Sequence, residues 1–202
     1  MGHVSDRSPT DEILAVNCQQ GDFSAFAELY QRYRRPVISY INQITHNYED
    51  SACVAQDVFL SVFEHVGRFD PERRFSTWLF AIARNAAIDY LQARYRKTIV
   101  NIGDVDQDNS PASVSFDGTA HIADTLGRAE SNQLLTAAIA QLPQMHREII
   151  ELVVFQDRSY DEASVILGGI NPNTLRSRMF HALRRLRVML LQAGGKMGQE
   201  LI

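Results

Sequence analysis

Hydrophobic residues recur at helical spacing through most of the chain, in runs separated by short polar stretches. Thr10 and Asp22 each precede such a run, and Thr and Asp are favoured caps at helix starts. The pattern predicts a short helix after Thr10 and a longer one after Asp22, followed by a third over Glu49 to Val66. The second helix is expected to turn one apolar face to a core: Phe23, Phe26, Leu29, Tyr30, Tyr33, Val37 and Ile41. The third carries valines four residues apart: Val54, Val58, Val62 and Val66.

The stretch from Arg68 to Lys97 combines a helical pattern with concentrated basic charge. Asp70-Pro71 predicts a loop and then a helix of about five turns, since Pro suits the first helical turn. Trp78, the only tryptophan, falls at the edge of the apolar arc of this helix. The apolar arc itself consists of Phe75, Leu79, Ile82, Ala83, Ala86 and Tyr90.

Seven basic and three acidic residues give this stretch a charge of +4 in a chain whose total is -4. An edge-placed indole among cations and an amide suits unpaired bases, which stack on aromatic faces while Arg and Lys meet their phosphates. A solvated amphipathic helix with its Trp half in the core fits the same pattern.

The helical pattern lapses after Lys97. Thr98 to Glu130 holds six acidic residues and one Arg among Gly, Ser and Asn, which is typical of a flexible linker. A second helical block follows from about Arg128. Within it, Ser159-Tyr160-Asp161-Glu162 predicts a capped helix start, and that helix ends at Gly168-Gly169.

A further cap at Asn171 then precedes a helix that carries five arginines and no acid up to Leu191. A short helix, a Gly-containing turn and a basic helix are typical of a helix-turn-helix, whose last helix enters the DNA major groove.

Composition narrows the class of protein. At 202 residues with 45% hydrophobic content, the chain is long enough for two small domains. No apolar run approaches the roughly 20 residues that span a bilayer, and no signal-peptide core is found, so we expect a cytoplasmic protein without membrane insertion. Two cysteines and six scattered histidines show no ligand spacing, and no phosphate loop or nucleophile motif is present. We therefore expect no enzyme, no catalytic residue, no cofactor and no metal site.

Taken together, the two blocks resemble the bacterial extracytoplasmic-function (ECF) sigma factors, group 4 of the sigma-70 family. The resemblance runs from about Asp11 to Leu190 and rests on four segments: GDFSAFAELYQRY, QDVFLSVFEHVGRFDPERRFSTWLFAIARNAAIDYL, LPQMHREIIELVVFQDRSYDEASVILG and TLRSRMFHALRRLR. It implies an all-α protein with a sigma2-like helical bundle and a sigma4-like helix-turn-helix, joined by a flexible acidic linker. The expected boundaries are a disordered N-terminus over 1–10, the first domain over 11–97, the linker over 98–128, the second domain over 129–193 and a disordered tail over 194–202.

By this resemblance the first domain opens and reads the promoter -10 element, the second reads the -35 duplex, and core RNA polymerase and promoter DNA are the partners. The residues expected at the -10 element are Arg68, Phe69, Asp70, Arg73, Arg74, Trp78, Arg84 and Asn85. Those expected at the -35 element are Asn173, Thr174, Arg176, Ser177, Arg178, Phe180 and His181.

The third helix resembles the one that docks on the clamp helices of polymerase, and the expected docking residues are Asp50, Cys53, Gln56, Asp57, Leu60 and Phe63. The family's usual run of Asp-Ala-Glu-Asp is here Asp50-Ser51-Ala52-Cys53, so two carboxylates are missing.

A phosphate group near these positions would add about -1.5 to -2 charges. We therefore hypothesise that phosphorylation of Ser51, or less favourably of Thr45 or Ser61, restores polymerase binding. Some family members are controlled by a serine/threonine kinase and others by an anti-sigma factor, and neutral drift at this motif explains the same departure.

Two other classes of protein fit parts of the pattern. A helix-turn-helix regulator would bind duplex DNA without being a polymerase subunit, and a helical adaptor would bind only proteins. The turn over 168–174 is one residue longer than is usual in the family, which weakens the base-contact assignments on the last helix.

Overall fold

The computed structural model describes residues 9–101 and 126–197. The predicted linker, the first eight residues and the last five of the predicted tail fall largely or wholly outside these ranges. Within them the chain is helical and has no strand, which confirms the all-α prediction. The chain divides into two compact units after Arg96, with the short stretch Val165–Gly169 grouped with the first. Each unit is described by itself.

The first unit is built from α1 (Asp11–Gln19), α2 (Phe23–Thr45), α3 (Tyr48–His65), a 3-10 turn (Val66–Arg68) and α4 (Phe75–Asn101). Three of these helices begin where a side-chain oxygen accepts from the first free backbone N–H groups. Thr10 Oγ1 accepts from the Ile13 N–H at 3.4 Å, and Asp22 Oδ1 from the Ser24 N–H at 2.8 Å. Asn47 Oδ1 accepts from the Asp50 N–H at 3.0 Å. The predicted caps at Thr10 and Asp22 are confirmed.

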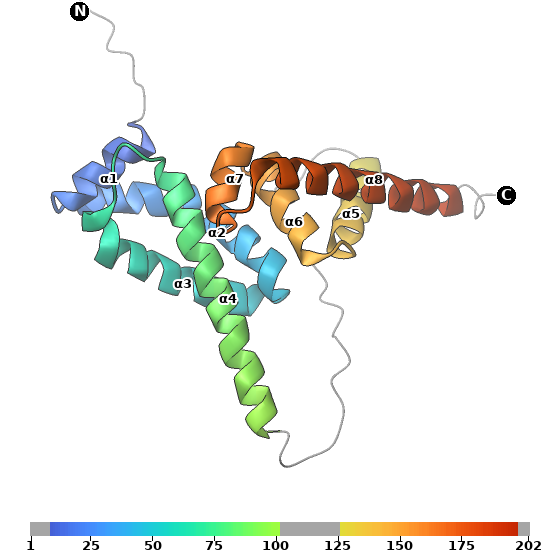
Figure 1. The fold of residues 1–202 in the computed structure, drawn as a ribbon, viewed down its shortest axis with the longest axis horizontal. Helices are drawn as coiled ribbons and strands as arrows, with labels where there is room; N and C mark the ends of the chain where they lie inside the picture. Colours follow the sequence, from blue (N-terminus) through green and yellow to red (C-terminus); the bar gives the residue numbers. More distant parts are fainter. Residues whose placement is uncertain (1–8, 102–125, 198–202) are drawn as a thin grey trace, which may run out of the picture. The chain divides into compact units, whose positions relative to one another are not determined.

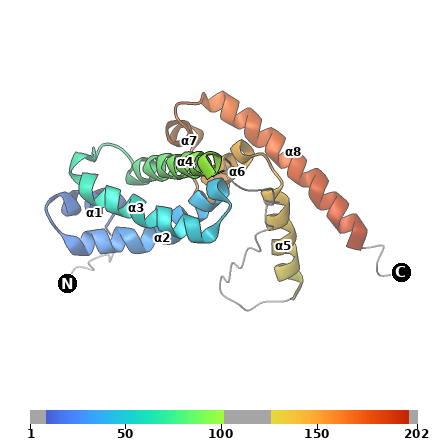
Figure 2. The same cartoon turned by 90° about the horizontal axis from the view of Figure 1, so that it is seen from below.

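The core of the first unit lies where α2, α3 and α4 turn their apolar faces inward, and α2 and α3 lie side by side (Figures 1 and 2). The predicted valines Val54, Val58, Val62 and Val66 are all buried, as are Leu29, Val37 and Ile41 of α2. Tyr40 meets the ring of Phe80 edge-on, with centroids 5.4 Å apart. Burial of such side chains contributes about 1.5–3 kcal/mol each.

Two expectations for the first unit are wrong. Phe23, expected in the core, is 72% exposed, because it is the first residue of α2 and lies on the outer side of a first turn whose Ala25 is buried. Phe80 was left out of the apolar arc of α4 but is fully buried.

The start of α4 also differs from expectation. The helix begins at Phe75, and Pro71 lies in a separate turn before it. Asp70 closes that turn, because its Oδ1 accepts from the Glu72 N–H at 3.0 Å and its carbonyl accepts from the Arg73 N–H at 3.0 Å. The helix then runs 27 residues to Asn101, well beyond the expected five turns.

The second unit contains α5 (Leu126–Ala140), α6 (Gln144–Ile150), a π-helical turn (Glu151–Phe155), all but the last two residues of α7 (Tyr160–Ile166), and α8 (Pro172–Met197). The expected cap of α7 is a reciprocal capping box: Ser159 Oγ accepts from the Glu162 N–H at 3.2 Å, and Glu162 Oε2 from the Ser159 N–H at 2.9 Å. The expected cap of α8 is also present, since Asn171 Oδ1 accepts from the Asn173 N–H at 2.9 Å.

The long helix α8 packs on α5 and α6 through one buried stripe: Leu175, Met179, Ala182 and Leu186. Arg147 of α6 fixes the preceding turn, because its Nη1 donates to the carbonyls of Ala140 at 3.2 Å and Leu142 at 2.5 Å. Its guanidinium thus satisfies carbonyls that the end of α5 leaves free. The opposite face of α8 is exposed over most of its length.

Candidate nucleic-acid interface

The indole of Trp78 is held in place by two buried phenylalanines. Its ring centroid lies 5.4 Å from that of Phe69 and 5.9 Å from that of Phe75, and the two phenylalanines meet edge-on at 5.6 Å. Trp78 itself is only half-buried, as the sequence pattern predicted. An indole fixed on one side and open on the other can stack on a planar base at little cost in side-chain entropy.

Phe69 has a different role from the one expected. The resemblance predicts a DNA contact for Phe69, but this residue is 4% exposed and packs under the indole. In this conformation Phe69 supports Trp78 and is not available to a nucleotide.

The loop before α4 presents charge to solvent. Arg68, Asp70, Arg73 and Arg74 are all exposed. Asp70 Oδ2 lies 3.5 Å from Arg73 Nε, but this pair is so exposed that it contributes little to stability and leaves Arg73 able to exchange partners. Asn85 is exposed and Arg84 half-buried, both further along α4.

Helix α1 holds this loop through hydrogen bonds that cannot be predicted from the sequence around the loop. Gln19 Nε2 donates to the carbonyl of Val66 at 2.9 Å and to that of Phe69 at 2.8 Å. Glu12 Oε1 accepts from the Phe75 N–H at 3.2 Å and so caps α4 from another helix. Sequence reasoning missed both residues, because their partners lie 47 to 63 positions away.

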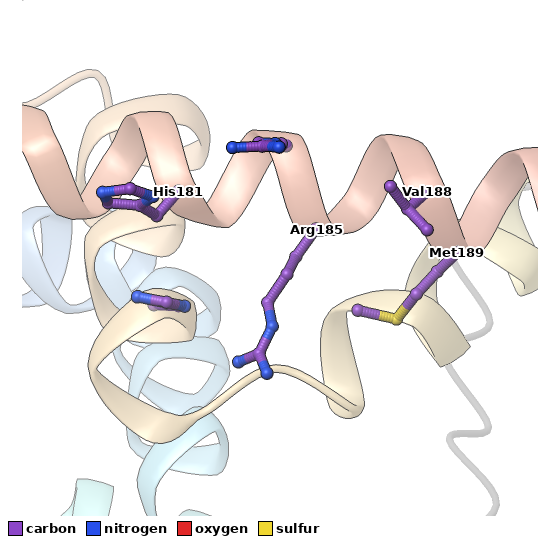
Figure 3. A pocket seen from close by; sticks show the side chains of 6 residues that line it. His181, Arg185, Val188 and Met189 are labelled. Atoms are coloured by element: carbon purple, nitrogen blue, oxygen red, sulfur yellow. The ribbon is translucent and has the colours of Figure 1, made fainter.

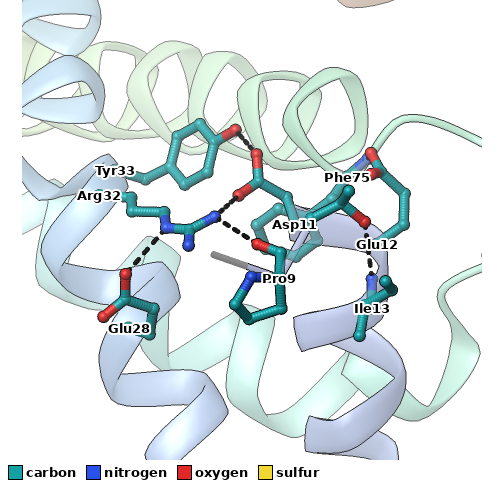
Figure 4. Close-up of polar contacts among 9 residues, drawn as sticks. Pro9, Asp11, Glu12, Ile13, Glu28, Arg32, Tyr33 and Phe75 are labelled. Atoms are coloured by element: carbon teal, nitrogen blue, oxygen red, sulfur yellow. Dashed lines mark hydrogen bonds and ion pairs between the residues drawn. The ribbon is translucent and has the colours of Figure 1, made fainter. Parts of the chain in front are cut away.

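A polar cluster anchors α1 in turn on α2 (Figure 4). Arg32 Nη1 donates to Asp11 Oδ1 at 2.7 Å and to the carbonyl of Pro9 at 3.0 Å, while its Nε donates to Glu28 at 3.0 Å. The Tyr33 hydroxyl donates to the other oxygen of Asp11. Hydrogen bonding to Asp11 raises the pKa of the Arg32 guanidinium. The cluster fixes α1, and α1 fixes the loop.

The expected polymerase-docking residues form one accessible face of α3. Cys53, Gln56, Asp57, Leu60 and Phe63 are exposed, with Leu60 at 61% and Phe63 at 45%. Phe63 stacks on Phe23 at 5.9 Å and meets Phe26 edge-on at 5.2 Å. We call Phe23, Phe26, Leu60 and Phe63 the aromatic patch. Exposed apolar clusters of this kind typically mark protein interfaces.

Asp50 is less accessible than expected. Its Oδ2 pairs with Arg94 Nη1 of α4 at 2.6 Å, and its side chain is 23% exposed. The same carboxylate raises the pKa of Tyr90, although burial of that phenol is the larger cause. A polymerase contact would have to compete with Arg94 for this carboxylate.

The burial of Ser51 argues against phosphorylation at that residue, whereas Ser61, another residue of the hypothesis, is half-buried. Ser51 is 0% exposed, and its Oγ lies 2.5 Å from the Asn47 carbonyl, 2.7 Å from Thr45 Oγ1 and 3.4 Å from Asn42 Oδ1. Thr45 is buried as well. A kinase cannot reach the Ser51 hydroxyl in the folded unit, and a phosphate would not fit there. The hydroxyl ties the end of α2 to the start of α3.

In the second unit the first half of α8 presents most of the expected DNA-reading residues to solvent: Asn173, Thr174, Arg176, Ser177, Phe180 and His181. Arg176 is oriented by α7, because its guanidinium carbon lies 5.1 Å over the Tyr160 ring and its Nη1 donates to Asn173 Oδ1 at 2.8 Å. Arg178 differs from the rest of the set. It is half-buried, and its Nη1 is sealed from solvent with no hydrogen-bond partner.

The turn between α7 and α8 depends on two glycines. Gly168 and Gly169 have φ values of 82° and 83°, a left-handed conformation that Gly adopts without strain. No neighbouring atom lies within 4 Å of an added Cβ at either position. The requirement for Gly is therefore set by the backbone and not by crowding.

Over residues 9–101 and 126–197, no group of three or more His, Cys, Asp or Glu side chains is placed to hold a metal ion. None of the described helices is both long and apolar enough to cross a membrane.

Two family models match the chain: Sigma-70 region 2 over residues 29–97 and Sigma-70, region 4 over residues 132–186. The ECF RNA polymerase sigma factor RpoE of Cereibacter sphaeroides is 31% identical over 190 residues, which cover 93% of this chain and 98% of that protein. The ECF RNA polymerase sigma factor SigM of Bacillus subtilis is 30% identical over 162 residues, which cover 80% and 93%.

Solved structures share the fold. CnrH in complex with the cytosolic domain of CnrY has a TM-score of 0.62 and 24% identity, covering 91% of this chain and 97% of that one. RpoE from Bartonella quintana, in complex with the anti-sigma factor NepR, has a TM-score of 0.59 and 20% identity, covering 81% and 96%. By sequence similarity over nearly its whole length, the chain belongs to the ECF family of RNA polymerase sigma factors, which are transcription initiation factors and not enzymes.

Proposed function

We propose that this alternative sigma factor divides its work among three surfaces: the loop and Trp78 at the -10 element, the first half of α8 at the -35 element, and the exposed face of α3 at core RNA polymerase. The observation that carries the proposal is the supported, half-open indole of Trp78 beside an exposed basic loop. We place its action in the cytoplasm, with polymerase and the chromosome.

At the -10 element the loop and Trp78 would capture bases that leave the duplex. Unpairing and unstacking a base costs a few kcal/mol, and stacking on an aromatic side chain returns about 1–3 kcal/mol. Arg68, Arg73 and Arg74 are exposed close to the indole in sequence and can meet the phosphates of the freed strand. No catalytic group is needed, because polymerase carries out the chemistry.

At the -35 element α8 would enter the major groove with its N-terminal half, as the last helix of a helix-turn-helix does. Arg176 is the strongest candidate for reading a base edge, since a guanidinium can donate two hydrogen bonds to guanine. Its contacts with Tyr160 and Asn173 hold it in a defined orientation before DNA binds.

At core polymerase the aromatic patch would supply apolar contact, and Gln56 and Asp57 polar contact. Aromatic residues are enriched among those that dominate interface energetics. The family carboxylates that are missing at positions 52 and 53 leave the docking face with less negative charge. The aromatic patch therefore contributes a larger share of the binding energy for core RNA polymerase.

We further propose regulation by an anti-sigma factor in preference to a kinase. Two of the proteins that share this fold were solved with a partner, CnrH with the cytosolic domain of CnrY and RpoE with the anti-sigma factor NepR. The buried Ser51 hydroxyl argues against control by phosphorylation at that residue.

The test is transcription in vitro from a library of random promoters with core polymerase and the purified chain. We expect a defined set of promoters to be transcribed only when both are present, and Trp78→Ala to lower initiation at least tenfold, while Trp78→Phe retains part of it. DNA binding that never requires polymerase would favour the helix-turn-helix regulator. An absence of any DNA dependence would favour the adaptor.

A further inference from the structure

A pocket of about 480 Å³ opens between α6 and α8 of the second unit (Figure 3). One side chain comes from α6 and five come from α8. The lining residues are His146, His181, Arg184, Arg185, Val188 and Met189.

The polar lining of this pocket is basic or neutral throughout. The described residues that line it carry two guanidinium groups and two imidazoles, and none of these residues carries a carboxylate. Burial lowers the pKa of His146, and the charges of Arg185, His181 and Arg178 lower it further. Cations gathered around a pocket without a counter-charge repel one another, and an anion would relieve that repulsion.

Two nitrogens in this neighbourhood lack hydrogen-bond partners although they are sealed from solvent: His146 Nδ1 and Arg178 Nη1. Buried polar groups are normally satisfied, and exceptions call for a functional explanation. Of the two residues only His146 lines the pocket, and its imidazole would have to turn before Nδ1 could meet an oxygen atom of a bound anion.

The position of the pocket on α8 points to the source of such an anion. His181 and Arg184 line the pocket and are also exposed, at helical spacing from Ser177 and Phe180 on the face assigned to the -35 element. The pocket therefore flanks the proposed base-reading face. When a recognition helix occupies the major groove, its flanks and the preceding helices lie against the phosphate backbone.

We propose that this pocket binds one phosphodiester of the promoter backbone beside the -35 element, held by Arg185, Arg184, His181 and His146. The inference rests on the proposed function, because it requires α8 to lie in the -35 major groove. Val188 and Met189 supply the apolar surface on which the adjoining deoxyribose packs. Contacts of this kind fix the register of the protein on the duplex without reading a base.

The test neutralises phosphates and side chains in turn. Holoenzyme made from core polymerase and the full chain is bound to a promoter obtained from the library selection, in which single backbone phosphates near the -35 element are replaced by uncharged methylphosphonates. We expect wild type to bind the promoter about tenfold more weakly when one particular phosphate is replaced. Arg185→Gln should bind unmodified DNA about tenfold more weakly than wild type does, and replacing that same phosphate should not weaken its binding further. The slope of log affinity against log salt should fall by about one for this variant.

Arg187→Gln is the matched control, since it removes the same charge from the same helix outside the pocket lining. Replacing that phosphate should still lower the promoter affinity of Arg187→Gln, whereas it should not lower the affinity of Arg185→Gln. His146→Gln serves as a second variant from the other wall, and circular dichroism melts establish that each variant folds.

The inference is overturned if Arg185→Gln responds to every methylphosphonate as wild type does, or if Arg187→Gln loses the same sensitivity. It is equally overturned if inorganic phosphate binds the pocket of the free chain while promoter affinity is indifferent to Arg185. If wild-type holoenzyme fails to bind any promoter, the proposed function itself has failed, and that result is distinct from the other two.

Discussion

At the residue scale, one amide links the helix that begins the fold to the loop that precedes Trp78. Gln19 donates to the carbonyl of Val66, the first residue of the 3-10 turn, and to that of Phe69, the residue just after the turn. Phe69 then packs under the indole. The position of Trp78 therefore depends on a side chain that need not touch DNA.

We predict that Gln19→Ala slows promoter opening about fivefold while affinity for core polymerase is unchanged. Two hydrogen bonds that order the loop are lost, each worth about 0.5–1.5 kcal/mol. Fluorescence of 2-aminopurine placed in the -10 element measures opening directly. Gln20→Ala, a change to the exposed neighbour, should behave as wild type, and equal opening by both variants would remove Gln19 from this role.

Ser51 gives the second prediction at this scale. Ser51→Asp should destabilise the first unit by about 3 kcal/mol or more, because a carboxylate would be buried among Asn42, Thr45 and Asn47. Ser51→Ala should cost about 1–2 kcal/mol through lost hydrogen bonds. Urea unfolding followed by Trp78 fluorescence measures both. If Ser51→Asp keeps wild-type stability and binds polymerase more tightly, a phosphorylation switch becomes tenable again.

At the scale of elements, the sequence predicted helices best where the signal for a boundary is local. The caps of α1, α2, α7 and α8 are each made by a side chain within three residues of the N–H it satisfies. The valine repeat of α3 likewise predicted the buried face, since spacing along one helix decides which residues share a side.

Expectations failed where distant segments decide the outcome. The start of α4 is set by Glu12, 63 residues earlier, so the Pro71 signal misplaced it. Phe69 and Phe23 were misjudged because apolar character alone does not say whether a ring supports a site or lies on the surface. Of the candidate site, most of the expected residues on α3, on α8 and in the basic loop are exposed, with Asp50, Arg178 and Phe69 as exceptions, and their binding roles stay predictions. The supporting contacts from α1 could not be foreseen.

The turn before α8 offers a prediction about an element boundary. Gly168→Ala should destabilise the turn between α7 and α8 by about 1–2 kcal/mol, because only the left-handed backbone opposes a Cβ there. Gly168→Asn should cost less. Gly67→Ala is the control, since that glycine is neither left-handed nor within 4 Å of a neighbour that a Cβ would meet. Thermal unfolding by calorimetry ranks the three, and equal melting temperatures for Gly168→Ala and wild type would contradict the prediction.

At the scale of the whole molecule, positive charge is concentrated in two places although the net charge of the chain is negative. The chain carries a net charge of -4, yet the stretch around Trp78 and the exposed side of α8 are both rich in arginine. A negative total charge weakens indiscriminate attraction to DNA, so in the proposed function the local basic surfaces act once polymerase has brought them to a promoter. In the proposed function the two units have different roles, strand capture by the first and duplex recognition by the second.

The most direct measurement is permanganate footprinting of unpaired thymines in the -10 element of a selected promoter. With core polymerase, wild type should make these thymines reactive, while Trp78→Ala should bind the same promoter and leave them largely protected. Neither core polymerase alone nor the chain alone should produce reactivity. Full reactivity with Trp78→Ala, or none with wild type and core polymerase together, would contradict the account.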